Sequence, residues 1–260
     1  MPVSGTTPVG VETSRGRSVN SDAGDRHALS DGQGRVPKTA IGYLPAHLVL
    51  WGATAVALAA DLYSKHWAFR VLDSQELRTV VPGVLAFRRS LNSGALFGMG
   101  AGRGPVFILA SIVALGFVVY LFWHSEARQR GLHLALGLIL AGALGNLYDR
   151  VFMVADILTL ATPPGYAIGL KVPGPDPDSV YLGSFPDGAN PRAYDDDEIV
   201  ARGQVGVVRD FIKLEPTLFG RQLWPWVFNM ADAWLVAGVG ILIIDFFRQS
   251  RRARKARRHA

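Results

Sequence analysis

Three polar residues in the last quarter of the chain have the types and positions that chemistry requires. Asn229 and Asp232 are three positions apart at the start of a long apolar run, and Asp210 lies within the apolar, β-branched segment 206–214. Residues three apart share one face of a helix, so Asn229 and Asp232 are expected to project together. A carboxylate inside a membrane span costs at least ~2.5 kcal/mol, which indicates that Asp232 has a partner or a function.

Two aspartates can do hydrolytic chemistry without a metal or another nucleophile. The chain contains no cysteine, which excludes thiolate catalysis and Cys-based zinc sites. Two neighbouring carboxylates cannot both ionise easily, so one keeps a proton and the pair can act as base and acid around a shared water. At a membrane boundary, Asp210 and Asp232 therefore predict aspartic-protease hydrolysis of a membrane-held substrate. No metal or cofactor is expected.

Long apolar runs are the elements that must position these groups. Hydrophobic residues make up 49% of the 260 residues and are bunched into runs rather than spread evenly. Runs of this length predict helices that cross a membrane. Four spans are predicted, at about 46–63, 105–123, 132–148 and 226–247.

Basic residues set the predicted orientation. Much of the net charge of +6 follows the fourth span, and Arg128 and Arg130 lie in the short connection 124–131. By the positive-inside rule these segments are cytoplasmic, which places both termini in the cytoplasm and the two long loops outside. The basic cytoplasmic tail, residues 249–260, predicts contact with membrane lipids rather than with nucleic acid.

Composition predicts the remaining organisation. Residues 1–40 are rich in Gly, Ser, Asp and Arg, which indicates a disordered cytoplasmic tail, and residues 41–248 form one domain. The segments near 79–87 and 206–214 have the pattern of strands. Residues 155–204 are rich in Pro, Gly and Asp and predict a long irregular extracytoplasmic insertion. The predicted fold class is therefore an all-α membrane protein with four transmembrane helices.

The unusual polar residues converge on one membrane boundary in this arrangement. The ends of the first and third spans, both long loops and the start of the fourth span all reach the outer boundary. Their polar residues are Asp61, Lys65, Asn92, Asn146, Asp149, Arg150, Asp210, Asn229 and Asp232. Scattered anchors would not include two asparagines and an aspartate within helices, so a functional site is favoured.

Five motifs stand at the ends of these predicted spans. They are Asp61 with Lys65, Asn92-Ser93-Gly94-Ala95-Leu96-Phe97, Gly145-Asn146-Leu147-Tyr148-Asp149-Arg150, Val208-Arg209-Asp210-Phe211-Ile212 and Phe228-Asn229-Met230-Ala231-Asp232. In order and position, this set resembles the motifs of lipoprotein signal peptidase (signal peptidase II) over about residues 46 to 247. The resemblance implies a four-helix aspartyl endopeptidase of the bacterial inner membrane with a small extracytoplasmic β-sheet. It would cut prolipoproteins before the diacylglyceryl-modified cysteine.

The resemblance also implies roles for individual residues. Asp210 and Asp232 match the catalytic pair. Positions that bind or order the substrate are matched by Asn92, Asn146, Arg150, Asn229 and Ala231, and supporting positions by Asp61, Lys65 and Asp149. The implied partners are a lipidated prolipoprotein and membrane lipids, and a monomer without nucleic acid or cofactor is expected.

The sequence departs from the family pattern in two ways near the first catalytic aspartate, and one of them leaves the identity of that aspartate open. About sixty residues separate Arg150 from Asp210, whereas the family has only a handful there, so Asp156 is a rival. Asp210 is preferred because Asp-Phe-Ile matches better and its spacing to Asp232 is close to that of the family. Arg209 also occupies a position that is usually apolar, which alters the charge beside the first aspartate.

Two functions of other classes remain open from the residues. A proton-coupled transporter would also carry acidic residues within the membrane. Against it, the acids gather at one boundary, and the sequence shows no inverted repeat. A non-catalytic scaffold would hold anionic lipid with its basic tail.

Overall fold

The computed structural model describes residues 39–94, 104–161 and 164–258. The predicted N-terminal tail, residues 1–40, therefore lies almost wholly outside the described residues. The same holds for residues 95–97, the second half of the motif that begins at Asn92. All elements below belong to the unit 37–260.

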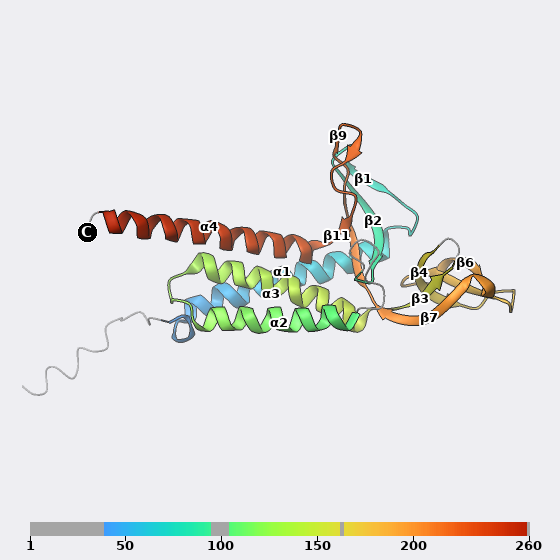
Figure 1. The fold of residues 1–260 in the computed structure, drawn as a ribbon, viewed down its shortest axis with the longest axis horizontal. Coiled ribbons are helices and arrows are strands. Elements are labelled where there is room, and N and C mark those ends of the chain that lie inside the picture. The colour runs from blue at the N-terminus through green and yellow to red at the C-terminus, as the bar shows by residue number, and fades with distance from the viewer. Residues whose placement is uncertain (1–38, 95–103, 162–163, 259–260) are drawn as a thin grey trace, which may run out of the picture. The chain divides into compact units, whose positions relative to one another are not determined.

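Helices and strands alternate in blocks along the described chain (Figure 1). The α-helices are α1 (Leu44–Val71), α2 (Gly104–Trp123), α3 (Arg130–Phe152) and α4 (Met230–Arg258), with short 3₁₀ helices at Ala40–Gly42 and Asp196–Glu198. The strands are β1 (Arg78–Val81), β2 (Leu85–Asn92), β3 (Val154–Leu160), β4 (Gly165–Val172), β5 (Ser179–Ser184), β6 (Ala189–Asp195), β7 (Ile199–Gly206), β8 (Val208–Leu214), β9 (Thr217–Leu218), β10 (Arg221–Gln222) and β11 (Val227–Phe228).

Helix α3 packs against α1, α2 and α4, and glycines permit the close approach. At Gly137, a Cβ atom would lie 2.6 Å from the carbonyl oxygen of Leu50 in α1, and at Gly142 it would lie 2.5 Å from that of Ala231 in α4. A larger residue does not fit at either position, so these glycines let the helices pack closely.

The prediction of four transmembrane helices is wrong. Among the described residues, three helices are long and apolar enough to cross a membrane: Leu44–Val71, Arg130–Phe152 and Met230–Arg251. The predicted span 105–123 corresponds to α2, whose described apolar part, Ile108–Trp123, is shorter. It falls below the ~20 apolar residues that a bilayer core requires of a helix.

The all-α class is also wrong, because about 48% of the described residues are helical and 32% lie in strands. One antiparallel sheet has the strand order β1-β2-β8-β11, and a second, which we call the inserted sheet, has the order β6-β5-β4-β3-β7. The inserted sheet spans Val154–Gly206 and replaces the irregular loop predicted for 155–204. Its prolines and glycines cluster between strands at 173–177, where they make turns, and β4 alternates buried and less buried residues as a strand does.

The inserted sheet leaves and rejoins the rest of the chain at one place. Strand β3 follows α3 directly and pairs antiparallel with β7, so that Val154 lies opposite Gly206. The backbone N–H of Val207 then donates to the carbonyl oxygen of Met153 at 2.8 Å. Because its two ends meet, the insertion does not separate β8 from the end of α3.

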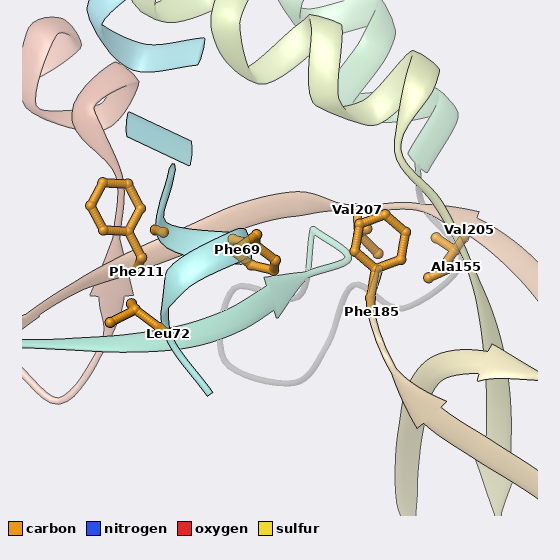
Figure 2. Packing of buried hydrophobic residues seen from close by; sticks show 8 residues of the cluster. Phe69, Leu72, Ala155, Phe185, Val205, Val207 and Phe211 are labelled. Carbon is orange, nitrogen blue, oxygen red and sulfur yellow. The ribbon is translucent and has the colours of Figure 1, made fainter. Parts of the chain in front are cut away.

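One hydrophobic cluster joins the inserted sheet to the end of α1 and to β8. Its buried members are Ala68, Phe69, Leu72, Ala155, Phe185, Val205, Val207 and Phe211. Figure 2 shows Phe185 beside Val207, with Val205 and Ala155 close by. Shared burial of this kind holds the inserted sheet against the elements that carry the candidate site.

Candidate active site

Asp210 lies in the middle of β8, on a strand that pairs with β2. In the β2–β8 register, Asp210 is opposite Ser90, and Asn92 is opposite Val208. Asn92 and Asp210 are thus diagonal neighbours on one face of the sheet, within reach of each other. The Asn92 side-chain amide donates to Asp210 Oδ2 at 3.1 Å. The Asp210 side chain is almost fully buried, with 2% of its surface exposed.

Asn229 caps α4 rather than lying inside it, which corrects the predicted helix start at 226. Val227 and Phe228 pair with β8 as strand β11, and α4 begins at Met230. The Asn229 side-chain oxygen accepts from the Asp232 backbone N–H at 3.1 Å, and Asp232 Oδ2 accepts from the Asn229 backbone N–H at 3.2 Å. This reciprocal pair is the capping-box arrangement, and it places the Asp232 carboxylate in the positive first turn of the helix.

Two asparagines connect the aspartates through hydrogen bonds. The Asn229 side-chain amide donates to Asp210 Oδ1 at 2.6 Å and to Asn146 Oδ1 at 3.1 Å. The Asn146 amide donates to Asp232 Oδ1 at 2.8 Å. Lys65 Nζ donates to Asn146 Oδ1 at 3.1 Å, which turns the amide group of Asn146 toward Asp232. The structure therefore brings the two aspartates into one hydrogen-bonded network.

A buried layer of charges lies beneath this network. Lys65 Nζ is 2.8 Å from Asp61 Oδ2 and 3.5 Å from Asp149 Oδ2, and all three side chains are fully buried. Asp61 Oδ1 also accepts from the backbone N–H of Ala231 at 2.8 Å, which links α1 to the start of α4. Asp149 is bound by the Arg209 guanidinium, with Nη2 at 2.7 Å from Oδ1.

Arg209 does not direct its charge toward Asp210, contrary to the expectation from sequence. Successive side chains of a strand point to opposite faces, so Arg209 leaves the sheet on the other side from Asp210. There it binds Asp149 through its backbone N–H at 2.9 Å as well as through its side chain. Arg209, which stands where the family pattern has an apolar residue, is thus neutralised by Asp149 of the third motif.

Both aspartates line one cavity of about 560 Å³. Asn92 lines it from β2, and Trp224 and Trp226 line it from the segment before β11. The aromatic wall is suited to an apolar ligand, and the acids and Asn92 are the polar groups that would fix its orientation. A cavity that combines apolar walls with two coupled carboxyl groups is a candidate active site.

The pKa of the Asp210 carboxyl is raised to about 7, mainly by burial and also by the negative charge of Asp232. Hydrogen bonds from Asn229 and Asn92 act in the opposite direction, because they stabilise the ionised form, but they are the smaller effects. Below about pH 7, Asp210 therefore keeps its proton, and a protonated carboxyl group is what the acid of such a pair must supply.

Three further residues singled out from sequence lie at or beyond the edge of this network. Arg150 Nη1 donates to the backbone oxygen of Asn146 at 3.5 Å, and Ala231 is fully buried. Asp156 belongs to the inserted sheet, where it accepts from the Lys171 backbone N–H at 2.7 Å. The described residues that line the cavity include Asp210 and Asp232. They do not include Arg150, Ala231 or Asp156.

Sequence reasoning missed Tyr166 and Ile168, which line the same cavity from β4 of the inserted sheet. They lie two apart on one face of the strand, but no motif marks them, because the segment was read as irregular. It also missed the pairing of Arg209 with Asp149. The available signal was the alternation of side chains along a strand, which places Arg209 on the opposite face from Asp210.

Known proteins that are similar to this chain include proteases of one membrane family. The family described as Signal peptidase (SPase) II matches residues 53–248. A lipoprotein signal peptidase of Desulfitobacterium hafniense is 28% identical over 176 residues, which are 68% of this chain and 78% of that protein. One of Rhodopirellula baltica is 36% identical over 109 residues, 40% of this chain and about half (49%) of that protein.

A solved bacterial membrane enzyme has a similar fold, with a TM-score of 0.52 and 22% sequence identity over 84% of this chain and 94% of that one. The alternative of a proton-coupled transporter has no support among these relatives. With the family match covering most of the sequence, the chain belongs to the signal peptidase II family and is a membrane protease.

Proposed function

We propose that this protease removes signal peptides from prolipoproteins, that it cuts before the diacylglyceryl-modified cysteine, and that Asp210 and Asp232 are its catalytic pair. The observation that carries the assignment of the pair is the single cavity that both carboxyl groups line, connected through Asn229. The names of the matched relatives support the substrate class.

The two carboxyl groups act in opposite protonation states. Asp232, in the first turn of α4, takes a proton from a water molecule as the water oxygen bonds to the scissile carbonyl carbon. Asp210 gives its proton to the carbonyl oxygen. When the C–N bond breaks, Asp232 passes its proton to the leaving nitrogen and Asp210 recovers one from the hydroxyl group. The pair ends in the state in which it started.

The other polar residues orient this pair or the substrate. Asn92 and Asn229 hold the Asp210 carboxyl group, and Asn146 holds that of Asp232. Arg150 donates to the backbone of Asn146, and its charge also interacts with those of Asp210 and Asp232. Ala231 anchors the start of α4. The supporting residues Asp61, Lys65 and Asp149 form the buried charges beneath.

The site faces the extracytoplasmic side of the inner membrane, and both termini are cytoplasmic. Asp61 and Asn146 lie toward the C-terminal ends of α1 and α3, whereas Asp232 is at the start of α4. The start of α1 and the end of α4 therefore lie at the end of the helices opposite the site. Helix α2 returns the chain to that end, because the backbone N–H of Ala40, before α1, donates to the carbonyl oxygen of Ser125, after α2. Arg248 and Arg251 follow the apolar part of α4, as expected for a cytoplasmic end. The protein acts as a monomer in contact with membrane lipids.

Cleavage by the purified protein is expected for a diacylglyceryl-modified prolipoprotein and not for its unlipidated counterpart. The lipid holds the substrate at the membrane boundary where the cavity opens. Mass spectrometry of the products identifies the bond that is cut. Cleavage of neither substrate would remove the proposal, and equal cleavage of both would remove the requirement for the lipid.

The rate of cleavage is expected to fall as the pH rises through about 7. Burial raises the pKa of Asp210 to about 7, so the proton that Asp210 donates is lost above that value. The measurement is kcat/KM against pH, in which a tenfold loss per unit is expected on the alkaline side. A flat profile between about pH 6 and about pH 9 would show that no such proton is needed.

A further inference from the structure

A second cavity of about 490 Å³ continues from the active-site cavity between the two sheets. We call it the insertion groove. One wall is β2 with the end of α1, including Arg88 and Arg89, and the other is the inserted sheet, including Tyr166, Ile168 and Ser184. Tyr166 and Ile168 line both cavities, as do Ser90 and Leu91, so the two form one continuous surface.

The walls of the insertion groove are held together by Arg89. Its guanidinium donates to the carbonyl oxygen of Leu72 at the end of α1, at 3.1 Å, and to that of Phe185 in the inserted sheet. It also lies 5.2 Å from the centre of the Phe69 ring. Phe69, Leu72 and Phe185 belong to the hydrophobic cluster that joins the insertion to α1 and β8. Arg89 and this cluster thus link the two walls of the groove.

The groove differs in chemistry from the cavity with which it connects. The active-site cavity has the tryptophan wall, whereas the groove offers Ser74, Gln75, Arg88 and Ser184. Hydroxyl, amide and guanidinium groups suit a hydrated polypeptide, and they do not suit an acyl chain or the apolar segment of a signal peptide. Arg88 is exposed and lies where β2 departs from regular pairing with β8, between Phe87 and Ser90, a bulge of the kind that redirects side chains near active sites.

We propose that the insertion groove binds the extended segment of the substrate that follows the scissile bond, with Tyr166 and Ile168 as specificity-determining contacts at its entrance. The proposal rests on the proposed function. On one side of the cut, the signal peptide remains with the helices. On the other, the mature chain leaves toward water, and the groove begins at the active-site cavity and runs along the inserted sheet. Arg88 favours acidic residues in that segment.

Two lipidated substrates test this assignment. The short one ends just after the modified cysteine, and the long one continues for about ten residues, which reach about 33 Å when extended. Tyr166→Ala is expected to lower kcat/KM for the long substrate about fivefold, the usual effect of removing an aromatic contact, mainly by raising KM. Cleavage of the short substrate should fall less, because that substrate meets Tyr166 only in the active-site cavity, and its continued turnover shows that the variant is folded.

Arg88→Ala provides a second variant on an exposed residue, and Val200→Ala provides the matched control. Val200 is 67% exposed on β7 of the same sheet and lines neither cavity. Arg88→Ala should weaken cleavage of long substrates that carry acidic residues, and Val200→Ala should change neither substrate. A photoreactive residue in the long substrate should crosslink to β4.

The experiment distinguishes failure of the groove assignment from failure of the proposed protease function. If the wild type cuts both substrates and Tyr166→Ala and Arg88→Ala affect both equally or neither, the groove does not hold the segment after the cut. Crosslinks that fall elsewhere than the inserted sheet would overturn it in the same way. If the wild type cuts neither substrate, the proposed function fails and the groove assignment fails with it.

Discussion

Asp210→Asn and Asp232→Asn are each expected to lower kcat by at least about 10³-fold, because an amide can neither hold nor pass the proton that the carboxyl group carries. Removing one member of a catalytic unit commonly costs as much as removing several, so the double variant should be little worse than either single one. Turnover of a lipidated prolipoprotein under single-turnover conditions is the measurement. Substantial cleavage by either variant would show that the substituted aspartate is not a catalytic residue.

The stability of Asp210→Asn separates loss of chemistry from loss of folding. Burial raises the pKa of Asp210 from its ordinary 3.8 to about 7 in the folded protein. The folded state therefore binds this proton more tightly than the unfolded state, and the resulting stabilisation is complete below pH 3.8 and lost as the pH rises through about 7. Asparagine has no such loss, so at about pH 8 the variant should unfold at no lower temperature than the wild type.

Lys65→Met is expected to destabilise the protein by about 3–5 kcal/mol, because it leaves buried carboxylates without their cation. Lys65 lies within 2.8 Å of Asp61 and 3.5 Å of Asp149, and none of the three side chains is exposed. Arg209 still binds Asp149, so the main loss falls on Asp61 and on the start of α4 that it anchors. Unfolding in detergent measures the effect, and activity should fall with it because Asn146 loses a bond that orients it.

An exposed ion pair provides the control for this variant. Arg202 binds Asp196 on the inserted sheet, where the two side chains are 47% and 59% exposed. Removing it by Arg202→Met should cost less than about 1 kcal/mol, since exposed pairs are screened by water. Equal losses for Arg202→Met and Lys65→Met would show that the buried charges beneath the site do not support it.

The candidate site was largely predictable because its residues are polar where the sequence is otherwise apolar. Asp61, Asn146 and Asp232 stand out in runs that a membrane would fill, and the expected helices bring them to one end. The structure does gather them with Asn92 and Asp210 into one hydrogen-bonded network. The roles of these residues remain predictions that the substitutions above test.

The inserted sheet was not predictable by the same reasoning. Hydrophobic runs identify helices, but a half-buried strand needs only alternate apolar residues, and the turns of 173–177 dominate the composition of the segment. The strands Val154–Leu160 and Gly165–Val172 pair with each other, and on their other sides they pair with β7 and β5, respectively. No local pattern encodes this pairing. Tyr166 and Ile168 therefore reach the cavity without any sequence signal.

The start of α4 shows how tertiary pairing overrides a local reading. Trp226, Val227 and Phe228 are apolar enough to continue the helix, but Val227 and Phe228 bond to β8 instead. Asn229 then serves as the cap, and its carbonyl oxygen accepts the first helical bond from Ala233. The same shift brings the Asn229 side chain within reach of Asp210.

The choice between Asp210 and Asp156 as partner of Asp232 is tested most directly by cleavage assays on Asp210→Asn and Asp156→Asn prepared alike. Asp156 accepts hydrogen bonds from Lys171 and Gln204 within the inserted sheet, whereas Asp210 lines the cavity with Asp232. Asp156→Asn should cut the lipidated prolipoprotein at close to the wild-type rate, and Asp210→Asn should not cut it. Cleavage that survives Asp210→Asn and is lost in Asp156→Asn would contradict the proposed active site.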